Sequence, residues 1–300
     1  MGQFSSIDLR DPRQVVRALH EGAQANRDAA CRKGSIDVIN PPGRLIATGD
    51  LHDNPLHFAR LIELAGMGGH EAQAHVTLHE IIHPDQLFGQ VDFSYRALTR
   101  VAQLKADFPE HVHVLLANHE LAQIVGAGII KNGVRVVEAF TEGIEHTFDE
   151  DADEVIRAIE VFVRSMPLAL RVHTPRGDIL CAHSLPGAAA MGRFDPSVLE
   201  RDLRDEDYEP RRGSAHLMVW GRDYDAEQLE DLVERWGVVM FILGHQHVPT
   251  GIELIPPNAV VLNSDHERGV YLEIDLSDPP TPERCLWEAR PITPPREMLE

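Results

Sequence analysis

The segment HEIIH (residues 79–83) holds two histidines four residues apart, with a glutamate directly after the first. On a helix this H-E-x-x-H spacing places both imidazoles on one face, where zinc proteases bind their metal ion. Here Pro84 follows at once, and a proline disfavours the helical conformation at the residue before it. The extended protease motif also fails, because Gln86 and Gly89 occupy the positions that require glycine and histidine. We therefore exclude a zinc protease.

Residue types that bind metal ions follow five predicted strands, at the point where each strand ends. Apolar runs predict these strands over 44–48, 75–78, 112–116, 178–181 and 238–243. The candidate ligands that follow them are Asp50 and His52; His79, Glu80 and His83; Asn118 and His119; His183; and His245 and His247. Carboxylate, amide and imidazole groups together suit Mn, Fe or Zn, and one carboxylate can bridge two ions. Their recurrence at strand ends predicts a metal centre assembled from the whole chain.

The elements that must position these residues follow from the hydrophobic periodicity. Helices are predicted over 55–66 and 93–107, between the first three strands, which gives the β-α-β-α-β order of a sheet with its site at the carboxyl ends of the strands. Further elements are predicted as helices over 11–33, 120–165 and 225–236, and as strands over 168–172, 259–263 and 269–275. We expect a single domain over 1–300, with an N-terminal helical extension over about 1–40 and an irregular, proline-rich C-terminal tail over about 279–300.

Composition narrows the class of protein. The chain has 300 residues and a formal net charge of −20, which disfavours nucleic acids and anionic membranes as partners. Three widely spaced cysteines give no disulfide framework, and no apolar run approaches the roughly 20 residues of a membrane span. The first residues lack the pattern of a signal peptide. We therefore expect a cytoplasmic protein, while its oligomeric state leaves no trace in the sequence.

In this order the motifs resemble those of the calcineurin-like metallophosphoesterases, and the resemblance runs from about residue 44 to residue 275. The segments that carry it are GDLHDN (49–54), ANHE (117–120), CAHSLPG (181–187) and GHQHVP (244–249). The last two are most similar to the branch that contains the Ser/Thr protein phosphatases and the diadenosine tetraphosphatases. The resemblance implies an α/β fold, a four-layer α/β/β/α sandwich of two mixed sheets.

The resemblance also implies roles for individual residues. It implies two divalent metal ions (Mn, Fe or Zn), one bound by Asp50, His52, Glu80 and His247 and the other by Glu80, Asn118, His183 and His245. His119 would be the general acid that protonates the leaving oxygen, while a hydroxide activated by the metal ions attacks phosphorus. The implied activity is that of a phosphatase, a metal-dependent phosphoric ester hydrolase.

The second motif departs from the family pattern Gly-Asp-x-x-Asp-Arg-Gly. Glu80 stands at the bridging aspartate, so that Glu80→Asp restores the usual residue and is expected to be tolerated. His83 stands at the aspartate that supports the catalytic histidine, and Pro84 at the arginine that binds phosphate. Asp85 is a candidate replacement carboxylate and Arg222 a candidate substrate-binding residue, and Ser264-Asp265-His266 is expected near the site.

Two functions remain open from the sequence. The first is hydrolysis of a phosphomonoester, or of a phosphate bond in a nucleotide or a phosphoprotein, with a phosphorylated small molecule, nucleotide or phosphoprotein as the partner. The alternative is a catalytically impaired binding module with the same fold, since the second motif has lost its aspartate and its arginine. The residues do not distinguish the substrate or the metal.

Overall fold

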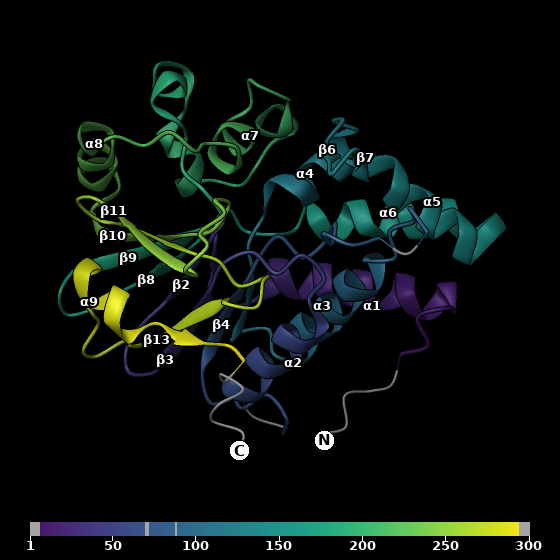
Figure 1. Cartoon of the computed structure of the whole chain (residues 1–300), viewed down its shortest axis with the longest axis horizontal. Helices are drawn as coiled ribbons and strands as arrows, with labels where there is room; N and C mark the ends of the chain where they lie inside the picture. Colours follow the sequence, from purple (N-terminus) through teal and green to yellow (C-terminus); the bar gives the residue numbers. More distant parts are fainter. Residues whose placement is uncertain (1–6, 70–71, 88, 294–300) are drawn as a thin grey trace.

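Two β-sheets form the centre of the molecule in the computed structural model, which describes residues 7–69, 72–87 and 89–293 (Figure 1). The smaller sheet has the order β14-β13-β3-β4-β5, formed by Arg290–Pro291, Val270–Asp275, Arg44–Thr48, His75–Leu78 and Val112–Val114. The larger sheet has the order β1-β2-β8-β9-β10-β12-β11, formed by Arg32–Lys33, Ile36–Ile39, Ala169–Val172, Asp178–Ala182, Val238–Leu243, Ala259–Leu262 and Ile252–Ile255. Both sheets mix parallel and antiparallel pairs.

The two sheets pack face to face through alternate residues of their strands. Leu45 and Ala47 of β3 share one buried apolar cluster with Met240 of β10, and this cluster is the core between the sheets. Ile46 and Phe241, their neighbours in sequence, belong instead to the cluster that includes the helices. This alternation follows from the two-residue period of a strand, which sends successive side chains to opposite faces.

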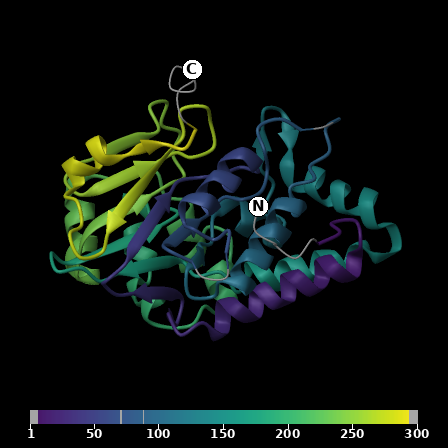
Figure 2. The ribbon, with the colours of Figure 1, turned by 90° about the horizontal axis from the view of Figure 1, so that it is seen from below.

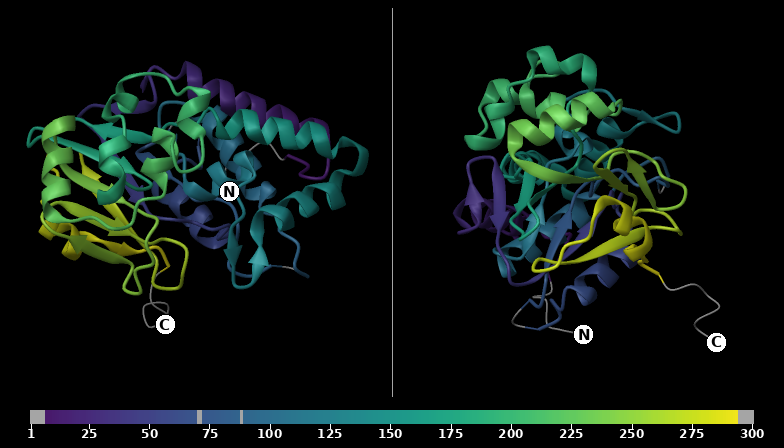
Figure 3. Two further views of the ribbon diagram at one scale, coloured as in Figure 1. Left: turned by 90° about the horizontal axis from the view of Figure 1, so that it is seen from above. Right: turned by 90° about the vertical axis from the view of Figure 1, so that its left-hand side faces the viewer.

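Helices cover the outer face of each sheet. The helices beside the smaller sheet are α2 (Pro55–Leu64) and α3 (Tyr95–Asp107), with α1 (Pro12–Asp28) packed against α3, and those beside the larger sheet are α7 (Ser214–Val219) and α8 (Ala226–Trp236) (Figure 1). A further group comprises α4 (Asn118–Val125), α5 (Val136–Phe148) and α6 (Ala152–Val163). The long helix α1 lies against α3 and α6 (Figure 2 and Figure 3). The expected four-layer α/β/β/α sandwich is therefore confirmed.

Both ends of the chain contain structure that the sequence did not predict. Residues 36–39 form strand β2, which pairs in parallel with β8 inside the larger sheet, so this part of the N-terminal extension belongs to the sheet. The expectation of an irregular tail is wrong for 282–291, because α9 (Pro282–Glu288) and β14 lie there. Thr281 caps α9 and Pro282 occupies its first turn, where proline is favourable. Residues 294–300 of that tail, and 1–6 of the extension, lie outside the described residues.

None of the helices in the described part of the chain has the length and apolar character that a membrane crossing requires.

Candidate metal centre

The two sheets meet at Asp50, two residues after the end of β3. Asp50 forms isolated parallel bridges to His79, which follows β4 in the same sheet, and to Asn263, which follows β12 in the other sheet. Gly49 permits this approach, because a Cβ atom there would lie 2.0 Å from the carbonyl oxygen of Leu262. The carboxyl ends of strands from both sheets therefore converge on one carboxylate.

One group of candidate ligands comprises Asp50, His79 and His183, all buried. Oδ1 of Asp50 lies 3.5 Å from Nδ1 of each histidine, and the two Nδ1 atoms are 3.1 Å apart. Nε2 of His79 donates to the carbonyl oxygen of Thr48 at 2.8 Å. Nδ1 of His79 must then carry a lone pair and accept a hydrogen bond from Nδ1 of His183, which leaves Nε2 of His183 with its lone pair available.

A second group comprises His52, Glu80 and His119. Oε1 of Glu80 lies 3.8 Å from Nε2 of His52 and 3.3 Å from Nε2 of His119. Nδ1 of His52 donates to the carbonyl oxygen of Ile82 at 3.1 Å, so its Nε2 carries the lone pair that faces Glu80. A histidine fixed in this way by a backbone carbonyl has the usual orientation of a metal ligand.

Nε2 of His183 connects the two groups. It lies 3.1 Å from Oε2 of Glu80, 2.7 Å from Oδ1 of Asn118 and 3.1 Å from Nδ1 of His245. In the tautomer of His183 that His79 requires, Nε2 of His183 carries a lone pair. This lone pair faces lone pairs on the oxygens of Glu80 and Asn118. Oε2 of Glu80 and Nε2 of His245 are also buried without a hydrogen-bond partner among the described residues. A divalent cation relieves such a meeting of lone pairs, so these residues fit a metal ion.

The charges of the site favour the same interpretation. Burial, with the negative charges of Asp50 and Glu120, raises the pKa of Glu80 well above its usual range. Burial likewise lowers the pKa of His79 to about 4, and lowers the pKa of His245 well below its ordinary value, each with a contribution from His183. A carboxylate that resists ionisation, beside neutral imidazoles, belongs to a donor set that a cation would stabilise in its binding form.

The backbone at the strand ends is strained. The backbone φ angles of His52, Glu80, His83 and His245 are 43°, 51°, 62° and 68°. Residues other than glycine rarely adopt this left-handed region. Each residue in this conformation costs about 1–3 kcal/mol of folding free energy, and the conformation persists only where the surrounding structure holds it. Four of them around one cluster are typical of a functional site.

Glu120 supplies part of that restraint. Its Oε1 accepts the backbone N–H groups of Ile81 at 2.6 Å and of Ile82 at 3.1 Å, and thereby holds the segment that follows Glu80. Glu120 is fully buried on α4, directly after His119. The sequence motif ANHE contains this glutamate, but only the structure gives it a positioning role.

Three expected site residues are not members of these groups. The side chain of His247 is exposed, and its ring lies 5.5 Å from that of His266. Asp85 is 63% exposed and pairs with Lys131 at 2.7 Å. Arg222 is exposed, and its carbonyl oxygen accepts from Nε2 of Gln246, the residue after His245, at 3.1 Å. The roles of His247, Asp85 and Arg222 therefore stay predictions from the sequence.

The late segment Ser264-Asp265-His266 does approach the site. Oγ of Ser264 accepts the backbone N–H of Gly49 at 2.8 Å, directly before Asp50. The carbonyl oxygen of Asp265 accepts from Nδ2 of Asn54 at 2.8 Å. These two hydrogen bonds attach the loop after β3 (residues 49–54) to the segment that follows β12 of the larger sheet.

A cavity of about 570 Å³ lies beside the same loop, between α2 and α3. Leu51, Asp53 and Ile81, the sequence neighbours of His52 and Glu80, contribute to its lining, together with apolar residues of the helices. None of the candidate ligands lines it, so we distinguish it from the metal centre.

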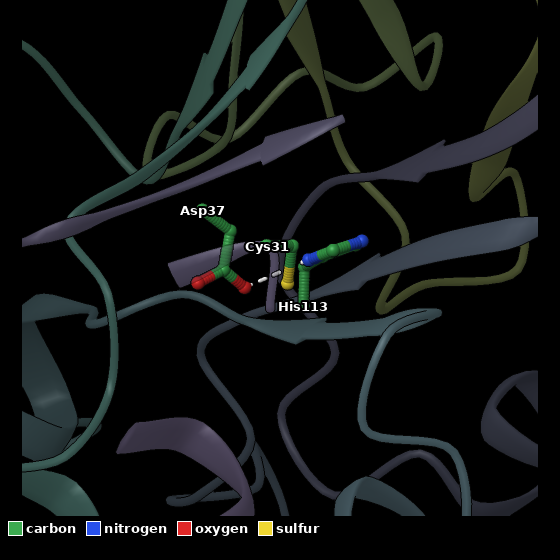
Figure 4. A group of neighbouring side chains, drawn as sticks. All are labelled: Cys31, Asp37 and His113. Atoms are coloured by element: carbon green, nitrogen blue, oxygen red, sulfur yellow. Dashed lines mark hydrogen bonds and ion pairs between the residues drawn. The ribbon is translucent and has the colours of Figure 1, made fainter. Parts of the chain in front are cut away.

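A third cluster, Cys31, Asp37 and His113, is buried where β2 approaches β5 (Figure 4). Nδ1 of His113 donates to Asp37 at 2.8 Å, and Asp37 also pairs with Arg32 at 3.0 Å. Nζ of Lys105 lies 4.0 Å from the same carboxylate. Burial raises the pKa of Cys31 to about 12, so its thiol stays protonated. Two permanent cations and a neutral thiol disfavour a metal ion, and we interpret this cluster as a structural charge network.

A family model described as calcineurin-like phosphoesterase matches residues 43–249. Among solved structures, a protein serine/threonine phosphatase from Saccharomyces cerevisiae, with similarity to human phosphatase PP5, is similar with a TM-score of 0.65. Its identity is 12%, over 88% of this chain and 82% of that chain. A cold-active protein-tyrosine phosphatase of a psychrophile Shewanella species has a TM-score of 0.51 and 14% identity, over 79% and 77% of the two chains. At these identities the likeness concerns the fold. No curated protein matches the sequence.

Proposed function

Since the chain belongs to the calcineurin-like phosphoesterase family, we propose that it is a phosphatase that hydrolyses phosphate esters with two divalent metal ions. One observation carries the proposal: carboxylates, an amide and imidazoles from strand ends of both sheets converge on Nε2 of His183 and on Glu80. This donor set is buried and fixed by backbone hydrogen bonds, as a preorganised metal centre requires.

The proposed ligands divide between two ions, in sets that draw on both groups. Asp50, His52 and Glu80 would hold one ion, and Glu80, Asn118, His183 and His245 would hold the other. His247 completes the first set in the sequence-based hypothesis, although it lies exposed beside His266. When bound, two such ions polarise phosphoryl oxygens and lower the pKa of water to near neutrality.

The chain's own residues then supply binding and proton transfer. His119 is our candidate general acid, because its Nε2 lies 3.3 Å from Glu80, at the edge of the donor set, and 11% of its side chain reaches solvent. From there its proton can pass to the leaving oxygen of a substrate bound over Glu80. Arg222 is our candidate for binding the phosphoryl group, since its carbonyl oxygen accepts from Nε2 of Gln246, the residue after His245.

Phosphomonoesters and the phosphate bonds of nucleotides or phosphoproteins remain the proposed substrate classes. The alternative is a binding module of the same fold without turnover, which the altered second motif favours. The residue types suited to metal binding that follow the other strands favour the enzyme.

Turnover of p-nitrophenyl phosphate by the purified protein with added Mn²⁺ tests the proposal. We expect activity that chelation abolishes and that Asp50→Asn removes while the fold, followed by circular dichroism, is retained. Asp231→Asn is the matched control, because Asp231 is an exposed partner of Arg235 on α8. A protein that binds Mn²⁺ but turns over none of a panel of phosphate esters would instead support the binding module.

A further inference from the structure

The second motif of this chain lacks the aspartate that supports the catalytic histidine elsewhere in the family, and His83 stands in its place. His83 is fully buried, and its ring centroid lies 5.2 Å from that of His119, at an angle of 54°. A histidine alone is a poor substitute, since two imidazoles that share a positive charge repel each other. A carboxylate must therefore lie behind His83 if the support is to be preserved.

That carboxylate is Asp92. Nδ1 of His83 donates to Oδ2 of Asp92 at 2.8 Å, and neither side chain is exposed to solvent. The other oxygen, Oδ1, accepts the backbone N–H of Ser94 at 2.7 Å, and Oγ of Ser94 accepts the backbone N–H of His83 at 3.1 Å. The pair is thus closed into a ring of hydrogen bonds that fixes both side chains.

The position of Asp92 is itself restrained by α5. Its backbone N–H donates to the carbonyl oxygen of Ala139 at 3.1 Å. Gly143 makes this approach possible, because a Cβ atom there would lie 1.9 Å from the carbonyl oxygen of Asp92. The ring of Phe140 closes the edge of His83, with centroids 5.5 Å apart.

The hydrogen bond to Asp92 fixes the tautomer of His83. Because Nδ1 carries the proton, Nε2 of His83 carries a lone pair. This atom and Nδ1 of His119 are both buried, and neither has a hydrogen-bond partner among the described residues. The two rings are neighbours, so a turn of the His119 ring lets its Nδ1–H donate to Nε2 of His83.

We propose that Asp92, acting through His83, is the positioning residue for His119, so that a His119–His83–Asp92 relay replaces the usual histidine–aspartate pair. This inference rests on the proposed function. It assigns no role to Asp85, whose carboxylate is exposed and paired with Lys131.

Asp92→Asn separates this role from a merely structural one. A general acid matters most for poor leaving groups, so we expect kcat for phenyl phosphate to fall about 10- to 100-fold and kcat for p-nitrophenyl phosphate to fall much less. KM and the metal content of the Mn²⁺-loaded protein should not change. The control is Asp207→Asn, which removes a buried carboxylate paired with Arg201 and should leave the ratio of the two rates unchanged.

The effect of Asp92→Asn on kcat for phenyl phosphate should change sign when His83 is replaced by aspartate, the residue of the family pattern. In His83→Asp two buried carboxylates would face each other, and adding Asp92→Asn relieves their repulsion. We therefore expect Asp92→Asn to raise kcat for phenyl phosphate in that background. If Asp92→Asn alone does not fold, His83→Asp and His83→Asn remain: the first should keep the normal dependence on the leaving group, and the second should lose it.

Two outcomes would overturn the relay. One is an equal loss on both substrates in Asp92→Asn, and the other is a loss of the same sign and size in the His83→Asp background. A wild-type protein without metal-dependent turnover would instead contradict the proposed function.

A different observation concerns the lost arginine, whose position is occupied by Pro84. Lys131, on β6 (Ile130–Lys131) of a hairpin with β7 (Val134–Arg135), reaches the segment on both sides of this proline. Its Nζ donates to the carbonyl oxygen of His83 at 3.2 Å and pairs with Oδ1 of Asp85 at 2.7 Å. Its side chain is only 22% exposed, against 63% for Asp85.

The ammonium group of Lys131 therefore lies at the segment that follows Glu80, in contact with the residues on both sides of the position of the lost arginine. Exposed ion pairs contribute little to stability, so a phosphate dianion can compete with Asp85 for this cation. We infer that Lys131 takes the place of the missing arginine and binds the phosphoryl group of the substrate, an inference that also rests on the proposed function.

Calorimetric titration of the Mn²⁺-loaded protein with inorganic phosphate tests this second inference. We expect Lys131→Met to raise the Kd about 10-fold and Lys131→Arg to leave it within about two-fold. Arg135→Met is the matched control, because Arg135 lies on the same hairpin and pairs with the exposed Glu138. Phosphate binding by Lys131→Met with the wild-type Kd would overturn the inference, whereas a metal-loaded wild type that binds no phosphate would contradict the proposed function.

Discussion

Oε2 of Glu80 lies 3.1 Å from Nε2 of His183, although the two residues follow strands of different sheets. The other oxygen of the same carboxylate faces His52 and His119. Glu80 therefore spans both groups of candidate ligands. The longer side chain, which departs from the family pattern, is the group that joins the two halves of the centre.

The sequence and the structure make opposite predictions for Glu80→Asp. The family pattern predicts tolerance, but the contacts of Glu80 reach three histidines, and a side chain shorter by one methylene cannot keep them all. We expect the variant to bind metal about 10-fold more weakly, measured by competition with a chelating dye. Wild-type affinity and activity would mean that the backbone at residue 80 moves to restore the usual bridge.

His79 should contribute to metal affinity without contacting substrate. It accepts from Nδ1 of His183 and donates to Thr48, so it fixes the ring of a proposed ligand. Gly244 leaves room for its ring, because a Cβ atom there would lie 2.4 Å from Cε1 of His79. We expect His79→Ala to weaken metal binding about 10- to 100-fold, with KM for p-nitrophenyl phosphate unchanged at saturating metal. An unaltered metal affinity would remove this role.

The Asp37 network should give acid-dependent stability. Burial alone would raise the pKa of Asp37, but the hydrogen bond from His113 and the charges of Arg32 and Lys105 lower it from 3.8 to about 2. Because the folded value is the lower one, this stabilisation is complete above about pH 4 and is lost as the pH falls through about 2.

Asp37→Asn tests this loss of stability at low pH. At about pH 7 it should lower the free energy of unfolding by roughly 3 kcal/mol, because Arg32 and Lys105 lose their buried partner. The difference from wild type, measured by urea denaturation, should shrink as the pH falls below about 4. A difference independent of pH would show that Asp37 is not ionised in the folded protein.

The sequence predicted those parts of the site that follow regular strands. Asp50, Glu80 and His183 each come two residues after an apolar run, and parallel strands bring such positions to one edge of a sheet. Strand β2 was missed because it is four residues long with the buried Asp37 inside it, which weakens the apolar pattern. The pattern also cannot show that His247 turns outward while His245, two residues before it, turns inward.

Asp92 and Lys131 carry no sequence signal at all. Each belongs to a segment without a motif, and each reaches the second motif only through tertiary packing, Asp92 through α5 and Lys131 through a two-stranded hairpin. For the same reason Asp85, nearest in sequence, was the natural candidate for the lost aspartate. The structure gives that contact to Asp92 instead.

Metal content measured together with turnover is the sharpest test of a phosphatase with two metal ions. Purified protein, loaded with Mn²⁺, desalted and analysed by inductively coupled plasma mass spectrometry, should hold about two ions per chain and hydrolyse p-nitrophenyl phosphate. His183→Ala, which removes the residue that connects both groups of ligands, should lose both the metal and the activity while it stays folded. A wild-type protein that retains no metal and is inactive with added Mn²⁺, or a His183→Ala variant with full metal content and activity, would contradict the account.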